Sequence, residues 1–206
     1  MIKNKETFYN KQPMIDYGVV TTILINETPV IIEYDDVADD GSPVKVKRQM
    51  YRYDSYRFDF GLGTLLPSKI KNLEEYVLRR IKDIIIDKIT KYDVSENVNL
   101  FYLHGNPMWL NDIKRTSLIK STNIRKSQGA ITTVLWDDDN NKYDIPVDMA
   151  LNMLNTLEMY ALDCYNMTAQ HKKNISEMDS IEDVLNYDYM AGYPKILHLP
   201  EDLSNF

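Results

Sequence analysis

The hydrophobic pattern of this chain changes its period near residue 66, and this change restricts the folds that the chain can adopt. Runs of β-branched and aromatic residues at 19–25, 29–34 and 44–60 are typical of half-buried strands. The first two runs are separated by Asn26-Glu27-Thr28, so the sequence predicts a β-hairpin there. We therefore expect residues 1–66 to form an N-terminal antiparallel β-sheet.

After residue 66 the apolar residues recur every three or four positions, which indicates amphipathic helices. The first long helix is expected from residue 68 to about residue 92, within a connecting region at 67–97. Its apolar stripe consists of Leu73, Val77, Ile81, Ile84, Ile85 and Ile89. Because one continuous apolar face must be buried, this helix is expected to be structural.

The third region, residues 98–206, mixes both patterns. In chain order the sequence predicts a strand (98–103), a basic helix (111–128), a β-hairpin (131–145), a long helix (148–177) and a short helix (180–186). Gly129 is the expected stop of the basic helix, and Ser180 with Asp183 predicts a capping box for the short one. The expected fold class is α+β, with an N-terminal antiparallel β-sheet, one long connecting helix, and a C-terminal β-hairpin plus helical module.

The chain has no segment that predicts export or membrane insertion. Residues 1–14 lack the apolar stretch of a secretory signal, and no run of 18 apolar residues occurs in the sequence. Cys164 is the single cysteine of the 206 residues and cannot form an internal disulfide. We expect a protein that folds in the cytosol without a membrane partner.

A net charge of -7 argues against broad nonspecific DNA binding, because the duplex is itself a polyanion. Two basic stretches still allow an alternative function as a nucleic-acid-binding accessory protein. Their cations are Lys45, Lys47, Arg48, Arg52, Arg57, Lys114, Arg115, Lys120, Arg125 and Lys126. The opposing interpretation of the first five is a strand pair whose cations face solvent.

No set of residues predicts catalysis, a cofactor or a metal. His104, His171 and His198 are far apart in the sequence, and Cys164 lies on the apolar stripe of a helix, where a thiol is inert. The most site-like feature is the acidic hairpin tip, Asp137, Asp139 and Asn141, which partly matches a calcium loop. Lys142 replaces the glycine of that loop, so a solvated turn is the competing interpretation.

Tyrosine dominates the aromatic residues, with 15 Tyr against 5 Phe and 2 Trp. Such rings are enriched at protein interfaces, because they are apolar along the body and polar at the tip. The interface candidates fall in two groups: Tyr51, Tyr53 and Tyr56, then Tyr187, Tyr189 and Tyr193. For the second group two arrangements remain open, namely folding back on the long helix or docking on a neighbouring subunit.

From Val98 onward, several landmarks follow one another in a specific order. They are Trp109-Leu110 followed by Arg115, Ser127-Gln128-Gly129 before Thr132 to Trp136, the helix Ala150 to Asn166 with Leu157-Glu158-Met159-Tyr160-Ala161, and Tyr187-Asp188-Tyr189 before Gly192-Tyr193-Pro194. In this order the C-terminal half resembles an uncharacterised domain of bacteriophages and prophages of gut bacteria, which recurs in tail-fibre and tail-associated proteins. The longer acidic tip and Lys195-Ile196 depart from the pattern of that domain.

This resemblance implies a virion component that is made in the bacterial host cytoplasm and assembled into a phage tail or neck. It carries no catalytic residues over to this chain. We therefore expect a structural protein rather than an enzyme: an adaptor, ring, collar or fibre-attachment subunit. Its partners would be further copies of itself and other tail or neck proteins. The low glycine content, 7 of 206, favours a compact connector over a fibre shaft.

Overall fold

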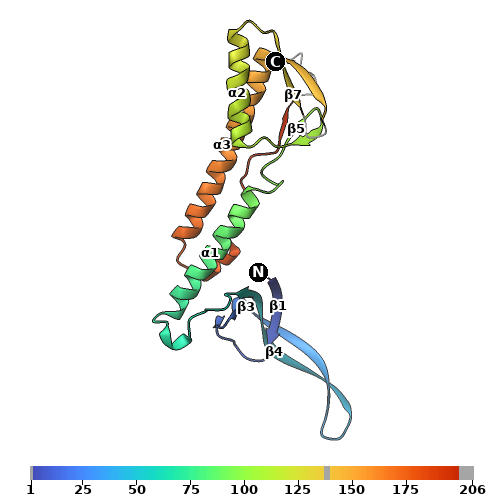
Figure 1. The fold of residues 1–206 in the computed structure, drawn as a ribbon. Helices are drawn as coiled ribbons and strands as arrows, with labels where there is room; N and C mark the ends of the chain where they lie inside the picture. The colour runs from blue at the N-terminus through green and yellow to red at the C-terminus, as the bar shows by residue number, and fades with distance from the viewer. Residues whose placement is uncertain (1, 137–139, 200–206) are drawn as a thin grey trace. The chain divides into compact units, whose positions relative to one another are not determined.

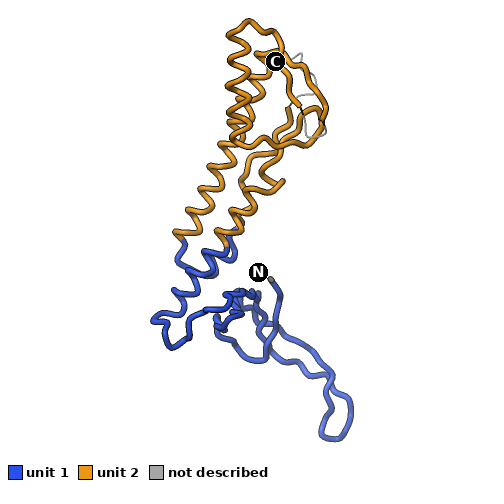
Figure 2. Tube along the Cα trace, viewed as in Figure 1, with its two compact units in different colours: residues 1–84, 178–187 blue, residues 85–177, 188–206 orange. Residues whose placement is uncertain are grey.

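The structure is a computed structural model and describes residues 2–136 and 140–199. The fold is α+β, as the sequence predicts (Figure 1). The chain divides into two compact units, which are described separately here. Unit 1 comprises residues 1–84 and 178–187, and unit 2 comprises residues 85–177 and 188–206 (Figure 2).

Unit 1 is built on a four-stranded antiparallel sheet. Its strands are β1 (Ile2–Phe8), β2 (Ile15–Asp16), β3 (Val20–Val37) and β4 (Pro43–Asp59), in the order β1-β4-β3-β2. The long strand predicted at 44–60 is β4, which lies between β1 and β3.

The hairpin predicted at Asn26-Glu27-Thr28 is wrong. β3 continues through these residues, and its register against β4 shifts between Ile25 and Thr28, which marks a β-bulge. Asn26 has a φ of 56°, a conformation that asparagine tolerates better than most residues. The polar triplet is therefore an irregularity within one strand, and the true turn follows Val37.

The long helix α1 (Leu73–Asp93) carries the predicted stripe, and Val77, Ile81, Ile85 and Ile89 are buried. It begins five residues later than predicted, after the short 3₁₀-helix η1 (Pro67–Lys69). Asn72 accounts for this start, because its Oδ1 accepts the backbone N–H of Glu75 at 3.2 Å, as an N-cap does. The division between the two units falls within α1.

Within unit 1, the first turns of α1 lie against the end of the sheet. Arg80 donates from a guanidinium nitrogen to the carbonyl oxygen of Phe60 at 2.8 Å, and its guanidinium lies 5.0 Å from the centre of the Phe60 ring. Tyr17 and Tyr76 meet edge to face at 6.0 Å. These contacts bury the same end of the sheet that holds Ile23 and Phe58.

Unit 2 combines two small sheets with helices. Its elements are β5 (Phe101–Leu103), β6 (Asn106–Met108), α2 (Asp112–Ser127), β7 (Thr132–Trp136), β8 (Lys142–Pro146), α3 (Val147–Glu177) and β9 (Leu197–Leu199). β7 and β8 form the predicted antiparallel hairpin, while β5 pairs with β6 and, in parallel, with β9. The strand predicted at 98–103 is shorter than expected and begins at Phe101.

Three helix ends follow from local capping, and the sequence predicts two of them, at Gly129 and at Ser180. Asn111 Oδ1 accepts the backbone N–H of Lys114 at 2.8 Å at the start of α2, and Gly129 follows its end with a φ of 79°. Ser180 accepts the backbone N–H of Asp183 at the start of α4 (Ile181–Asn186), which belongs to unit 1. These signals depend only on neighbouring residues, which is why they can be read from sequence.

The core of unit 2 forms around α3. It contains Val98, Phe101, Leu103, Met108, Leu135, Ile145, Met149, Ala150, Met153, Leu157, Tyr160, Cys164 and Leu199. Among the described residues, no helix is both long enough and apolar enough to cross a membrane.

Candidate functional site

A long and largely exposed element of unit 1 is the distal part of the β3–β4 hairpin, which we call the β-arm (residues 30–50). β1 pairs with β4 only as far as Tyr51, and β2 pairs with β3 only at Thr22 and Ile23. Beyond these points the two strands pair only with each other in the described part of the chain. No residue from 26 to 49 is buried, and Figure 1 shows the ribbon extending from the sheet of unit 1.

The two faces of the β-arm differ in chemistry, because residues directly opposite one another in a strand pair share a face. One face is mainly apolar and carries Val30, Ile32, Tyr34, Val44, Val46 and Met50. Arg48 crosses this face, with its guanidinium 5.7 Å from the Tyr34 ring and 5.5 Å from the Tyr9 ring. By the same register Asp36 lies opposite Val44 on this face, so outside the turn the face carries one cation and one carboxylate among its apolar side chains.

The opposite face of the β-arm carries cross-strand ion pairs. Glu33 lies between two lysines, with Oε1 3.3 Å from Lys45 Nζ and Oε2 3.7 Å from Lys47 Nζ. These groups are exposed, so the pairs contribute little to stability. Their importance lies in their arrangement, since the acidic groups are all on one strand and the basic groups all on the other.

The charges of the β-arm are segregated completely by strand. Residues 30–36 of β3 contain three acidic and no basic side chains, namely Glu33, Asp35 and Asp36. Residues 44–50 of β4 contain three basic and no acidic side chains, namely Lys45, Lys47 and Arg48. This segregation is visible in the sequence. Only the pairing of β3 with β4 shows that the acidic and the basic segment lie side by side.

The first group of predicted interface tyrosines needs correction. Tyr53 and Tyr56 are only 3% and 2% exposed, because β4 is a central strand at these positions. The Tyr53 hydroxyl donates to Glu27 Oε2 at 2.9 Å and accepts the backbone N–H of Gln12 at 3.1 Å. These two rings belong to the core of the sheet and cannot serve as contact surface. Tyr51 is half-buried, beside the Lys11 ammonium.

The second group of tyrosines is largely engaged within the chain. In unit 2, Tyr189 meets Tyr92 edge to face at 6.1 Å, and the Tyr193 ring lies 5.4 Å from Tyr92. Tyr187, in unit 1, is half-buried. Of the two arrangements left open by the sequence, folding back is the one found for Tyr189 and Tyr193.

A chain of polar contacts anchors this returning segment. The Thr168 hydroxyl donates to Asp93 Oδ1 at 2.7 Å and lies 2.8 Å from the Tyr193 hydroxyl. His171 Nε2 lies 3.0 Å from the carbonyl oxygen of Ala191. Thr168 and His171 are buried, and their contacts hold the returning segment within unit 2. Desolvation raises the pKa of the Tyr193 hydroxyl above its ordinary value.

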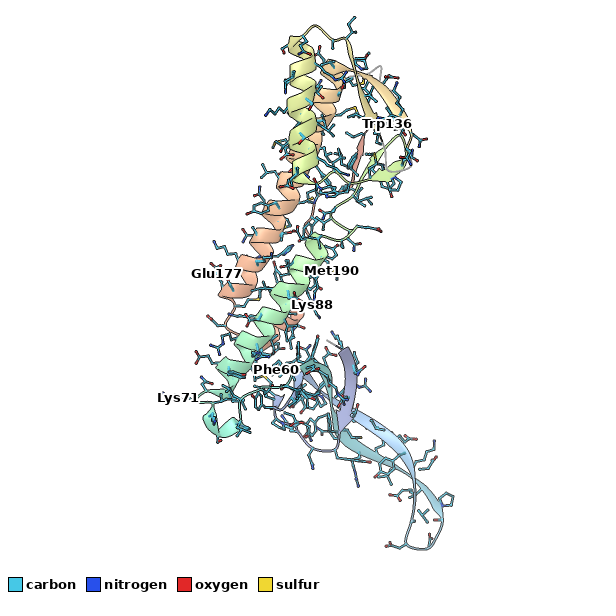
Figure 3. All side chains as sticks on the ribbon, viewed as in Figure 1. Phe60, Lys71, Lys88, Trp136, Glu177 and Met190 are labelled. Carbon is cyan, nitrogen blue, oxygen red and sulfur yellow. The ribbon has the colours of Figure 1, made fainter. Side chains whose placement is uncertain are left out.

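Unit 2 contains an apolar cavity of about 360 Å³. Its lining comes from β5, β6, α2, β7, α3 and β9 and includes Phe101, Met108, Leu118, Leu135, Leu157 and Leu199. Lys114 and Ser117 are the polar residues of the lining, which also includes Trp136, 58% exposed and labelled in Figure 3. The described residues of the lining include no acid, histidine or thiol, and apart from Lys114 and Ser117 they are suited to contact an apolar group.

Arg115 is the most buried cation of the described residues, at 7% exposure. Its Nε donates to Glu158 Oε2 at 2.6 Å, another guanidinium nitrogen donates to the carbonyl oxygen of Leu110 at 2.7 Å, and the group lies 5.5 Å from the Trp109 ring. Lys126 pairs with Asp148 at 2.7 Å. Arg115 is therefore not available to contact nucleic acid, unlike the other cations of the basic stretch. It links α2 to α3 instead.

The histidines and Cys164 have separate surroundings in the described residues. His104 stacks on Tyr143 at 4.9 Å, and His198 stacks on Tyr102 at 4.6 Å. Cys164 is buried, and desolvation raises the pKa of its thiol. Asp137 and Asp139 of the acidic tip lie outside the described residues. Within those residues, no three His, Cys, Asp or Glu side chains are grouped to hold a metal ion.

The comparisons with known proteins add no relative. No protein-family model matches this chain, and no curated protein and no solved structure matches it. The functional argument therefore rests on the residues and surfaces described above.

The buried Tyr160 predicts a loss of stability at alkaline pH. Its hydroxyl donates to the carbonyl oxygen of Val98 at 3.4 Å, and burial raises its pKa to about 12. In the unfolded chain a tyrosine titrates near pH 10, so between about pH 10 and 12 the unfolded state loses a proton that the folded state keeps. We expect the urea midpoint to fall over this range, and to fall less steeply in Tyr160→Phe.

The matched control is Tyr165→Phe, on the exposed side of α3. Its urea midpoint should change with pH as in the parent protein. An unchanged slope in Tyr160→Phe would show that this phenol does not control the alkaline transition.

Proposed function

We propose that this chain is a structural subunit of a bacteriophage virion, acting as an adaptor, ring, collar or fibre-attachment protein of the tail or neck. The chain would assemble with copies of itself and with neighbouring tail or neck proteins. In this proposal it has no catalytic role, and it is made in the host cytoplasm before it joins the particle.

The observation that carries the proposal is the β-arm. A two-stranded ribbon is marginally stable in water, because neither strand has a second neighbour and no core covers its apolar face. Here such a ribbon extends for many residues, with valine, isoleucine and tyrosine side chains half-exposed on one face. A partner that covers this face would gain apolar burial, and exposed patches of this kind are typical of assembly surfaces.

Two further features support an assembly role. The C-terminal half resembles the phage tail-associated domain through residues such as Trp109, Arg115 and Tyr193. In the structure these same residues hold unit 2 together, as cation–aromatic and hydroxyl contacts. The described lining of the cavity in unit 2 is mostly apolar and contains no acid, histidine or thiol, which agrees with a scaffold.

The test is the protein composition of purified virions of the phage whose genome carries this sequence. Mass spectrometry of gradient-purified particles should detect the chain. Its amount, calibrated against the major capsid protein, should correspond to several copies per particle. A particle reconstruction should then place it in the tail or neck. Its absence from infectious particles would refute the proposal.

A shortened variant connects this test to the β-arm. Replacing residues 30–50 by Asn-Gly joins Pro29 to Tyr51, which are opposite one another, through a two-residue turn. We expect this variant to fold, as judged by circular dichroism, but to be missing from virions produced by complementation. The control is Ile113→Ala, an exposed position on α2, which should be incorporated normally.

A further inference from the structure

We propose that the β-arm joins copies of this chain edge to edge, with the basic β4 edge of one copy pairing antiparallel with the acidic β3 edge of the next. This inference deepens the proposed function and rests on it for its biological setting. The partner is a second copy of this chain, and the contact is a continuation of the antiparallel sheet.

Both edges of the β-arm are free to pair in the described structure. Along residues 30–36 and 44–50 each strand has one neighbour, so every second residue presents its backbone N–H and C=O outward. Each edge offers seven consecutive residues without proline. Pro29 and Pro43, which lack the N–H donor, stand just outside these stretches.

Charge decides which edges can meet. The β3 edge carries Glu33, Asp35 and Asp36, and the β4 edge carries Lys45, Lys47 and Arg48. Two β3 edges would bring three carboxylates against three carboxylates, and two β4 edges would do the same with cations. Like charges directly opposite one another are destabilising in a sheet, whereas opposite charges stabilise it. Only the contact between β3 and β4 is complementary.

This pattern differs from ordinary protection of an exposed edge. Natural sheets place charges on edge strands to prevent pairing, and lysines alone on both edges would serve that purpose. Opposite signs on the two edges of one ribbon instead prevent pairing of like edges and favour pairing of unlike ones. In the resulting sheet, each basic strand would lie between two acidic strands.

The contact uses two different surfaces of the same chain, so it is heterologous. Repetition of a heterologous contact closes into a ring where the rotation per copy permits, and otherwise it extends into a filament. The β-arm would therefore contribute a continuous antiparallel belt to an assembly of several copies. In such a belt, each strand of the β-arm gains a second neighbouring strand, which it does not have in a single copy of the chain.

The test is a charge-swapped variant that preserves the pairs within the ribbon. It combines Glu33→Lys, Asp35→Lys and Asp36→Lys with Lys45→Glu, Lys47→Glu and Arg48→Glu. Parent and swapped proteins should each assemble alone in sedimentation velocity at low salt, and the assemblies should weaken as salt increases. When differently labelled parent and swapped proteins are mixed, energy transfer should be at least about ten-fold below that of two parent samples.

A matched control swaps an exposed ion pair elsewhere, through Asp87→Lys with Lys91→Asp on α1. This variant should mix freely with the parent protein. The shortened variant lacking residues 30–50 should be monomeric. Free mixing of the charge-swapped protein with the parent, a folded swapped protein that does not assemble, or a parent protein that stays monomeric would each overturn the inference.

The two proposals fail separately. If the chain is found in virions but its charge-swapped form mixes freely with the parent protein, the structural function stands and edge pairing is refuted. If parent and charge-swapped proteins assemble separately in solution but the chain is absent from virions, the edge-pairing proposal stands and the virion function is refuted.

Discussion

Replacing Arg115 by leucine is expected to lower the free energy of unfolding by about 3 kcal/mol. The guanidinium is buried and donates at 2.6 Å to Glu158 and at 2.7 Å to the carbonyl oxygen of Leu110. Leucine removes both bonds and the contact with the Trp109 ring, and it leaves a carbonyl oxygen without its donor. Urea denaturation followed by circular dichroism measures the loss.

Two companion variants separate charge from geometry. Arg115→Lys keeps the positive charge but cannot reach Glu158 and Leu110 with a planar fork, so we expect it to lose about half as much stability as Arg115→Leu. Glu158→Gln leaves the buried guanidinium without its anion while preserving the shape of the side chain. A loss below about 1 kcal/mol in Arg115→Leu would mean that this contact does not fasten α2 to α3.

Leu157→Ala is expected to lower the free energy of unfolding by about 4 kcal/mol. The leucine is 1% exposed, lies in the core of unit 2 and borders the apolar cavity. Truncation adds its volume to a space of about 360 Å³ that already exists, so lost contacts are poorly recovered by relaxation. Thermal and urea unfolding both report this loss.

The matched control lies on the same helix. Leu162 is 46% exposed on α3, and Leu162→Ala should change stability by no more than about 0.5 kcal/mol. Similar losses in the two variants would contradict the assignment of Leu157 to the core. A small loss in both would indicate that the neighbours of Leu157 close around the shorter side chain.

Local signals account for the elements that could be predicted. The starts of α2 and α4 depend on Asn111 and Ser180, each of which caps a helix through a backbone N–H three residues away. The buried face of α1 follows from apolar residues at four-residue spacing. Neither signal requires knowledge of what the helix packs against.

The false hairpin shows where local reasoning fails. Asn26-Glu27-Thr28 has the composition of a turn, but pairing with β4 on both sides converts it into a bulge. Whether a polar triplet turns the chain or bulges depends on the partner strand, which is distant in sequence. The same limit applies to Tyr53 and Tyr56, whose burial depends on β4 lying between β1 and β3.

By itself, the sequence determined the α+β class, the apolar faces of the helices and the opposite charges of two strand segments. Only the tertiary structure decided that Tyr53, Tyr56 and Arg115 are buried and that residues 30–49 form a ribbon without a buried residue. Periodicity reports that a face is apolar, but coverage of that face depends on where the neighbouring strands end. Because β1 reaches only to Tyr51 and β2 only to Ile23, one continuous hairpin is buried at its base and exposed to solvent at its tip.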